Sequence, residues 1–505
     1  MTTLGGNDEE ADRDQQHMII LFNPRATRPR NRRLPLSVLS IGAMLEGKED
    51  YRIVDGNLDS NPIETISGLI QAHAVELLAL TVMPGPQMVS AVESCKEIRA
   101  RFPHVPIVWG GYFASNYTNA ALNAPYVDFT VRGQGEETFL DLLDALRGRR
   151  SYESILGLSY KSSAGEICHN YERPMKPLES FPVLPYHRVP VEDYLLPTFL
   201  GKRTAVHQAS IGCPFRCNFC GVVPFSGARE KMEPPARTEA ALRRLVENYR
   251  ADAVQFYDNN FFLRESHARE LAERLAPLGL RWWCMARIDI VMSYSDATLE
   301  ALRRAGCTMA FFGAESGSDA TLKDMQKQLK AGETLELAAR IRRFGIIPEF
   351  SFVVGNPQDP EGDTRQCFGF IRKIKRLNPE AEIIIYPYTP VPQRDQEMYG
   401  GLNGNYQFPI TPEEWATERW QKFIIRKDPE TPWFEPATRR LMQNFELVLS
   451  SRWPTVQDAR LPDWGRRLLK TLSDWRYRLG VYTYPVELEW AQRFIGLRKP
   501  KEESL

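Results

Sequence analysis

The chain has 505 residues, of which 43% are hydrophobic, 25% charged and 11% aromatic. A chain of this length exceeds one ordinary hydrophobic core, so two or three domains are expected. Basic and acidic residues balance at 64 each, which excludes a global field drawing the protein to nucleic acid or an anionic membrane. Any such contact would require a local patch.

The first 17 residues, MTTLGGNDEEADRDQQH, are polar and acidic and predict a disordered tail. They lack the positive flank and apolar run of a secretory signal, and no stretch approaches the roughly 18 apolar residues of a membrane span. We therefore expect a cytoplasmic protein without a membrane span. In that reducing compartment, clustered cysteines favour metal binding or catalysis over disulfides.

Residues 18–150 alternate between short apolar runs and segments with helical spacing. Strands are expected at MIILFNP, YRIVDG, VELLALTVM, VPIVWGG and VDFTVRG. This alternation predicts parallel strands joined by crossover helices, hence a doubly wound, Rossmann-like α/β domain. Such sheets bind ligands at the carboxyl ends of their strands.

The rest of the chain divides into three segments. Residues 151–200 have a hairpin-like start and a proline-rich end, which predicts a connector. Residues 201–400 contain six βα-like units, enough for a six-stranded partial (β/α)6 TIM-like barrel. Residues 401–505 lack such alternation and predict a helical cap with seven of the ten tryptophans, most of which we expect in its core: Trp415, Trp420, Trp433, Trp453, Trp464, Trp475 and Trp490.

Three of the eight cysteines crowd into SIGCPFRCNFCG after the first strand of the predicted barrel, as Cys213, Cys217 and Cys220. A closed zinc site requires a fourth nearby Cys or His, which is missing here. Three thiolates with one open position suit a [4Fe-4S] cluster, and a zinc knuckle or chance spacing is the alternative. Cys284, Cys307 and Cys367 are expected to be small buried hydrophobes.

The stretch CPFRCNFC resembles the signature of the radical S-adenosylmethionine (radical SAM) superfamily. The resemblance implies that the three cysteines hold a [4Fe-4S] cluster, with Gly212 and Gly221 allowing a tight loop. SAM then binds the open iron and releases a 5'-deoxyadenosyl radical on reduction. By their order at the strand ends, the residues expected near SAM are Phe219, Asp258, Asn259, Asn260, Arg287, Glu315, Ser316 and Gly355.

The domain before the barrel resembles the cobalamin-binding domain joined to one branch of this superfamily. The resemblance rests on FNP, VDGN, TVMPGP, VWGGYFAS and VRGQGEET, and the alternative is a flavodoxin-like domain with another ligand or none. The Asp-x-His-x-x-Gly motif is absent, so no histidine of this domain is expected on cobalt. The expected cobalamin-binding residues are Pro24, Asp55, Thr81, Val82, Met83, Pro84, Gly110, Gly111, Gly133, Gly135 and Glu136.

Together the resemblances imply a cobalamin-dependent radical SAM enzyme that methylates an unactivated carbon of a small molecule such as a natural product, lipid or tetrapyrrole. The alternative reaction is oxidative cyclisation or ring rearrangement, as in relatives resembling the anaerobic magnesium-protoporphyrin ester cyclase. A non-catalytic cobalamin or cluster sensor is a third hypothesis. The expected partners are a small-molecule substrate and an external one-electron donor such as flavodoxin or ferredoxin, without nucleic acid.

The stretch RRLLKTLSDWRYR predicts an amphipathic helix with a solvated basic side.

Overall fold

Five short apolar segments near the N-terminus pair as parallel strands in the order β2-β1-β3-β4-β5. Their bounds are β1 Met18–Asn23, β2 Asp50–Asp55, β3 Val75–Thr81, β4 Ile107–Gly110 and β5 Phe129–Val131. Every residue of β1 is buried, as expected for a central parallel strand covered on both faces. This is the predicted doubly wound sheet, and its strand order reverses between β1 and β3.

The computed structural model describes residues 17–393, 396–402, 406–425, 431–456 and 461–495. The chain forms two compact units, and each is described by itself. The first contains residues 1–176, 180–191 and 408–417, and the second contains 177–179, 192–407 and 418–505. The predicted disordered tail lies outside the described residues, except for its last residue.

Helices cover both faces of the first sheet. Ile19 and Leu21 of β1 share one hydrophobic core with Val38 of α1 and with Phe139 and Leu142 of α6. Because side chains alternate along a strand, the other buried residues of β1 face the opposite layer. The helices of this unit are α1 Leu36–Leu45, α2 Pro62–Ala72, α3 Pro86–Arg101, α4 Gly111–Asn116, α5 Thr118–Leu122 and α6 Glu136–Leu146.

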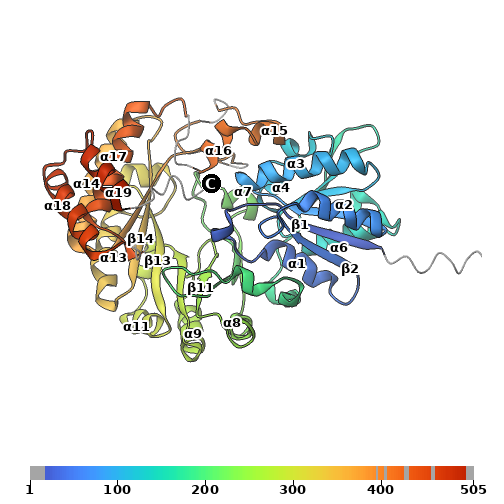
Figure 1. The fold of residues 1–505 in the computed structure, drawn as a ribbon, viewed down its shortest axis with the longest axis horizontal. Coiled ribbons are helices and arrows are strands. Elements are labelled where there is room, and N and C mark those ends of the chain that lie inside the picture. Colours follow the sequence, from blue (N-terminus) through green and yellow to red (C-terminus); the bar gives the residue numbers. More distant parts are fainter. Residues whose placement is uncertain (1–16, 394–395, 403–405, 426–430, 457–460, 496–505) are drawn as a thin grey trace, which may run out of the picture. The chain divides into compact units, whose positions relative to one another are not determined.

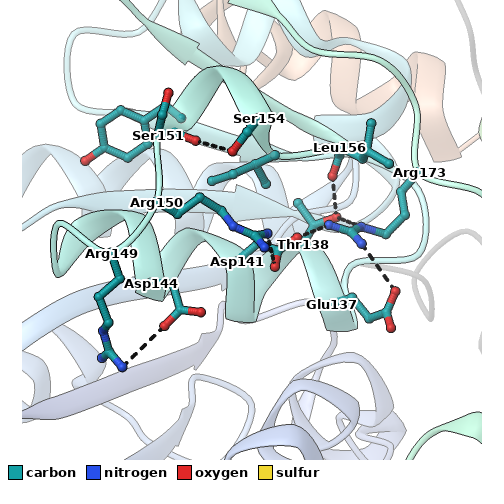
Figure 2. A network of polar contacts seen from close by, with 12 residues as sticks. Glu137, Thr138, Asp141, Asp144, Arg149, Arg150, Ser151, Ser154, Leu156 and Arg173 are labelled. Atoms are coloured by element: carbon teal, nitrogen blue, oxygen red, sulfur yellow. Dashed lines mark hydrogen bonds and ion pairs between the residues drawn. The ribbon is translucent and has the colours of Figure 1, made fainter.

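The predicted connector contributes two strands to this sheet. Strands β6 (Leu158–Lys161) and β7 (Ile167–His169) form an antiparallel hairpin, and β6 pairs with β5. Figure 2 shows how the hairpin is held to α6: Thr138 Oγ1 donates to the carbonyl of Leu156 at 2.8 Å, and Arg173 Nε donates to Thr138 Oγ1 at 2.8 Å. Arg173 also pairs with Glu137 and Asp141.

A segment far along the chain completes the first unit. Residues 408–417 include α15 (Pro412–Trp415), and the Trp415 ring is fully buried. Its centroid lies 5.7 Å from that of Phe113 and 4.6 Å from that of Tyr117. Asn123 Nδ2 donates to the Ile410 carbonyl at 2.8 Å. Residues 408–417 of the predicted C-terminal cap therefore belong to the first unit, while residues 418–505 belong to the second.

The second unit is built on a six-stranded parallel sheet in the order β15-β14-β13-β12-β11-β8, the predicted partial barrel (Figure 1). Its strands are β8 Thr204–His207, β11 Ala253–Phe256, β12 Arg281–Ala286, β13 Cys307–Glu315, β14 Ile347–Val354 and β15 Glu382–Pro387. A separate antiparallel pair, β9 (Ser210–Gly212) and β10 (Glu230–Met232), flanks the cysteine loop. Cys284, Cys307 and Cys367 are buried, as predicted.

Helices follow each strand of this sheet, and polar residues begin several of them. The side chains of Ser295, Ser318 and Asp359 accept hydrogen bonds from the third helical N–H of the helices they precede. These helices are α7 Val222–Ser226, α8 Pro235–Tyr249, α9 Glu265–Leu275, α10 Ile288–Met292, α11 Asp296–Arg304, α12 Asp319–Asp324, α13 Ala331–Ile341 and α14 Pro360–Leu377.

The C-terminal part of the second unit is helical, as predicted. Its helices are α16 Glu418–Ile425, α17 Pro436–Arg452, α18 Asp463–Leu479 and α19 Val486–Ile495. Short 3-10 turns occur at Pro29–Asn31, Tyr152–Ser154, Leu178–Ser180, Tyr186–Arg188, Val191–Tyr194, Ala276–Leu278 and Arg342–Phe344. Among the described residues, none of the helices has the length and apolar character that crossing a bilayer demands.

Candidate functional site

The cysteine loop leaves the sheet through a glycine that no other residue replaces easily. Gly212 has φ of +85°, and a Cβ there would lie 2.2 Å from the carbonyl oxygen of Arg229. Gly221 differs from our expectation. Its φ of −73° is accessible to any residue, so only the first glycine is required by the turn.

The three thiols lie close enough to affect one another electrostatically. Cys217 is buried, and Cys213 and Cys220 are half-buried. Burial raises the pKa of Cys213, and it raises the pKa of Cys220 to about 11, with the charge of Cys217 adding to both shifts. The Cys220 N–H donates to the Cys217 carbonyl at 3.1 Å, closing the turn between them.

Two buried cations lie beside these thiols. Arg287 Nη1 donates to Cys217 Sγ at 3.7 Å, and its guanidinium carbon lies 3.6 Å from the centroid of the Phe215 ring. Lys327 attracts the charge of Cys217 and forms an ion pair with Glu315 at 2.7 Å. Its carbonyl accepts from Arg287 Nη2 at 2.6 Å, so the two cations are held together.

This donor set fits a [4Fe-4S] cluster, because each thiolate binds a separate iron and cationic neighbours favour the ionised thiols. Within the described parts of the chain, no three His, Cys, Asp or Glu side chains are arranged to hold a single metal ion. Lys327 was not predicted. Nothing in its sequence surroundings, KDMQKQLK, distinguishes it from the surface lysines on either side.

Buried polar atoms without partners lie at the end of β11. Asp258 and Asn260 are fully buried, and Asn259 is half-buried. Asp258 Oδ2 accepts from the Ala209 N–H at 3.2 Å. Its Oδ1 and both polar side-chain atoms of Asn260 have no hydrogen-bond partner among the described residues. Burial raises the pKa of Asp258 to about 6. Orphaned groups of this kind indicate a polar ligand at this place.

A second carboxyl group, not predicted from the sequence, belongs to this cluster. Glu230 lies on β10 directly opposite Gly212. Burial, reinforced by the charge of Asp258, raises the pKa of Glu230 to about 8, and its Oε1 has no partner among the described residues. Two carboxyl groups that each repel the other's charge form a site for a cationic group. No motif marks Glu230, because its position depends on the β9-β10 pairing.

The ends of β13 and β14 bring the next predicted residues to the same edge. Glu315 is buried with φ of +60°, and its carboxylate is held by Lys327. Ser316 Oγ accepts from the Ser318 N–H at 3.2 Å. Gly355 has φ of +86°, and a Cβ there would lie 2.7 Å from the ring of Phe434. The C-terminal helical region therefore packs directly on the end of β14.

Phe219 lies within a hydrophobic cluster of the second unit. It packs with Met325, Val353, Tyr388 and Tyr399, and Lys327 Nζ lies 5.9 Å from its ring centroid. Protein atoms thus cover part of this ring. That Phe219 also contacts a cofactor stays a prediction.

In the first unit, a polar network occupies the carboxyl ends of β1 and β2. Asn23 Nδ2 donates to Asp55 Oδ1 at 2.9 Å, and Gln87 Nε2 donates to the carbonyl of Pro24 at 3.2 Å. Gln87 Oε1 accepts from the Met83 N–H at 2.9 Å, linking the loops after β1 and β3. Asp55 therefore stabilises the loops around the topological switch point, where ligands of such sheets bind.

The loop after β3 presents both buried and exposed residues. Val82 is fully buried, and its N–H and carbonyl are bonded to the Gly110 carbonyl and the Phe113 N–H, whereas Met83 is 53% exposed and Pro84 half-buried. A Cβ on Gly111, whose φ is +84°, would lie 2.8 Å from Thr81 Oγ1. Gly110 has an ordinary extended φ of −124°. Gly111, the second residue of the pair, is thus the one whose φ angle and close approach to Thr81 require glycine.

The loop after β5 is partly open. Gly133 has φ of +70°, and a Cβ there would meet no atom within 4 Å. A Cβ on Gly135 would lie 3.0 Å from Val131 Cγ1. Ser40 Oγ donates to Glu136 Oε1 at 2.7 Å, and burial raises the pKa of Glu136. Open space therefore adjoins Gly133, whose N–H donates to Ser115 Oγ at 2.9 Å, while Glu136 joins α6 to α1.

The described histidines of this domain do not lie at the ligand-binding edge of the parallel strands. His17 precedes β1, His73 follows α2 and His104 follows α3, so all three lie at the edge where a parallel strand begins. This placement agrees with the absence of a cobalt-binding histidine motif.

The sequence comparisons identify both domains. Residues 28–143 match the B12 binding domain family, and residues 208–371 match the radical SAM superfamily. The chain is 26% identical to an uncharacterized methyltransferase, PH0819, of Pyrococcus horikoshii over 67% of this chain and 73% of the relative. It is also 26% identical to the anaerobic magnesium-protoporphyrin IX monomethyl ester cyclase of Synechocystis over 83% of this chain and 88% of the relative.

The fold has solved counterparts. The structure of the cobalamin-dependent S-adenosylmethionine radical enzyme OxsB with aqua-cobalamin and S-adenosylmethionine bound aligns with a TM-score of 0.68. The alignment covers 96% of this chain and 76% of that chain at 16% sequence identity, which shows a shared fold.

The chain is thus a radical SAM enzyme, as the cysteine loop predicts. More narrowly, it combines the radical SAM domain with a B12-binding domain, and its homologues are cobalamin-dependent radical SAM methyltransferases and magnesium-protoporphyrin monomethyl ester cyclases. These domains imply a [4Fe-4S] cluster and SAM for the second unit and cobalamin for the first.

Proposed function

We propose that this protein methylates an unactivated carbon of a small-molecule substrate. When bound, the cluster and SAM supply radical chemistry at the substrate carbon, and cobalamin supplies a transferable methyl group. One observation carries the proposal: the cysteine loop, two buried cations, the buried Asp258 and the half-buried Glu230 lie close enough to one another to interact electrostatically.

The carboxyl cluster is assigned to the ammonium group of SAM. An ammonium donates three hydrogen bonds, and Asp258 Oδ1, Glu230 Oε1 and Asn260 Oδ1 are acceptors without partners among the described residues. A bound cation favours the ionised form of both carboxyl groups and removes their mutual destabilisation. This set replaces the Gly-Gly-Glu segment common in the superfamily, which the chain lacks.

Arg287 and Lys327 are assigned to the thiolates. Arg287 donates to Cys217 Sγ and is oriented by two hydrogen bonds of 3.0 Å to Asp289. Lys327 is held by Glu315 and raises the fraction of ionised thiol by its charge. Four of the five N–H groups of Arg287 are engaged, and the second N–H of Nη1 is assigned to the predicted contact with the methionyl carboxylate. Phe219, Asn259, Ser316 and Gly355 stay predicted SAM contacts.

In the first unit, the exposed Met83, the half-buried Pro84 and the open space beside Gly133 are assigned to cobalamin contacts. Thr81, Val82, Gly110 and Gly111 shape the loops that present them. We further propose that cobalt receives no histidine from this domain. An external one-electron donor of the flavodoxin or ferredoxin class is required, because reduction of the cluster consumes an electron that no residue provides.

The test is anaerobic reconstitution with iron, sulfide and cobalamin, followed by reduction in the presence of SAM. The wild type is expected to show a [4Fe-4S] spectrum, to bind cobalamin and to form 5'-deoxyadenosine. Replacing Cys213, Cys217 and Cys220 by Ala is expected to abolish the spectrum and the 5'-deoxyadenosine while cobalamin still binds. Cys168→Ala, a half-buried cysteine of β7, serves as the matched control. A full cluster spectrum in the triple variant contradicts the proposal.

The cyclase reaction is the second candidate, because a cyclase is 26% identical across most of the chain. Methyl transfer consumes a second SAM and releases S-adenosylhomocysteine. A turnover that yields 5'-deoxyadenosine without S-adenosylhomocysteine therefore favours cyclisation. A reconstituted protein that makes no 5'-deoxyadenosine above background supports a sensor instead.

A further inference from the structure

Four exposed aromatic side chains of the second unit lie on two C-terminal helices, α18 and α19, which are side by side (red in Figure 1). Trp464, Trp475 and Trp490 are exposed, so the expectation of core packing fails for these three of the seven tryptophans of this region. Trp415 and Trp420 are buried and follow that expectation. The difference identifies a surface that ordinary core packing does not explain.

On α18 the exposed apolar residues form one stripe. Successive residues of a helix are about 100° apart, so Trp464, Leu468, Trp475 and Leu479 fall within an arc of about 60°. Four exposed apolar residues within this arc, two of them tryptophans, expose more apolar surface than a solvated helix face normally does. The opposite side of α18 packs on the unit, with Leu469 and Tyr477 buried.

A second stripe continues the first on α19. Val486, Trp490 and Phe494 follow one another at four-residue spacing, and the two aromatic residues are 75% and 74% exposed. The Phe494 and Trp464 rings meet edge to face with centroids 6.3 Å apart, which joins the two stripes into one surface. We call these seven residues the aromatic face.

Buried contacts behind the aromatic face hold it in shape. Arg476 donates to Glu487 Oε2 at 2.9 Å and to the carbonyls of Thr483 at 2.8 Å and Tyr484 at 3.1 Å. Leu461, Leu469 and Ala491 form a small hydrophobic core between the helices. The exposure of the stripes is therefore imposed by the fold and does not reflect a loosely packed end of the chain.

Exposed cations border the aromatic face. Arg467 lies beside the α18 stripe and Arg493 beside the α19 stripe, whereas Lys470 projects from the other side of α18. Neither Arg467 nor Arg493 forms an ion pair with another residue in the described ranges. Tryptophan and phenylalanine bordered by arginine match the boundary between acyl chains and anionic headgroups.

We propose that the aromatic face docks on the surface of an anionic lipid bilayer, with the helices in the plane of the interface. A two-fold contact between copies of the chain would instead bring the same cationic border twice into one interface, which is unfavourable. The proposal needs neither cluster nor cobalamin, so it stands or fails independently of the proposed function. Docking on a bilayer would bring the enzyme to substrates that dissolve in membranes.

The test is flotation of the cofactor-loaded full chain with vesicles of phosphatidylcholine containing about one third phosphatidylglycerol. Wild type is expected to float with these vesicles and to partition more weakly into pure phosphatidylcholine or at high salt. Trp490→Ser with Phe494→Ser is expected to lower partitioning at least about tenfold. Arg467→Glu with Arg493→Glu is expected to remove the preference for the anionic lipid. Tyr171→Ser, which changes an exposed aromatic of the first unit, is the matched control and should float like wild type.

Wild type that stays with the soluble fraction overturns the proposal, as does a Trp490, Phe494 variant that floats unchanged. Light scattering that shows a dimer of wild type and a monomer of this variant assigns the face to a second copy. A chain truncated after residue 495 that floats when wild type does not assigns it to the C-terminal segment. Circular dichroism checks that each variant is folded, and the substituted side chains are exposed enough to be replaced without a cavity.

Discussion

The ion pair between Lys327 and Glu315 allows a sharp test of the site's electrostatics. Both side chains are less than one tenth exposed, and their charged atoms are 2.7 Å apart. With an effective dielectric constant of about 20, this separation corresponds to an attraction of about 6 kcal/mol. Desolvation of both groups offsets part of it. Removing one partner is therefore expected to cost about 3–5 kcal/mol, because the other charge stays buried.

Lys327→Met is the perturbation, and Glu315→Gln with Lys327→Met is its matched control. The double variant removes both charges and keeps the shapes. Its loss of unfolding free energy should therefore be at least about 2 kcal/mol smaller than the summed losses of the two single variants, Lys327→Met and Glu315→Gln. Hydrogen exchange of peptides that contain β13, followed by mass spectrometry of the apo-protein, measures the free energy of opening. A Lys327→Met cost below about 1 kcal/mol, or full additivity, would refute the reasoning.

Three further predictions concern the turn, the buried segment and the pH dependence. Gly212→Ala should prevent cluster assembly, measured as bound iron and sulfide, whereas Gly221→Ala should assemble it normally; equal iron contents would contradict the role of positive φ. Trp415→Ala should destabilise the first unit by about 3–5 kcal/mol in urea unfolding, whereas the exposed Trp490→Ala should change it little. Hydrogen bonding from Arg188 lowers the pKa of Glu46 to about 2, so this carboxylate stabilises the fold fully above its ordinary pKa of 4.5 and loses that contribution as pH falls towards 2. Glu46→Gln should therefore narrow the difference in Tm between pH 6 and pH 3, and an unchanged difference would rule this out.

Much of the architecture follows from patterns within single elements. Short apolar runs that end in glycine or asparagine predict the parallel strands of both sheets, because hydrophobic periodicity is a local property. The strand ends then place Asp258, Arg287 and Glu315 at one edge, since parallel strands share their carboxyl ends. The spacing of Cys213, Cys217 and Cys220 points to the cluster on the same grounds.

Contacts between distant elements could not be predicted in this way. Glu230 reaches the site only because β10 pairs with β9, and Lys327 becomes a buried cation only where the chain after α12 returns to Arg287. Trp415 looked like part of a C-terminal cap but belongs to the first unit. Its burial depends on Phe113, about 300 residues earlier, and such packing leaves no periodic signal.

The sequence by itself determined the order of strands and helices, the cysteine loop and the strand-end positions of most candidate residues, because each depends on neighbours along the chain. Only the tertiary structure decided which carboxyl groups and cations face the thiols. It also decided that Trp464, Trp475 and Trp490 are exposed, because a helix pattern shows which residues share a side but not which side another element covers. Packing between elements determines which side chains are buried, and this burial defines both the site and the aromatic face.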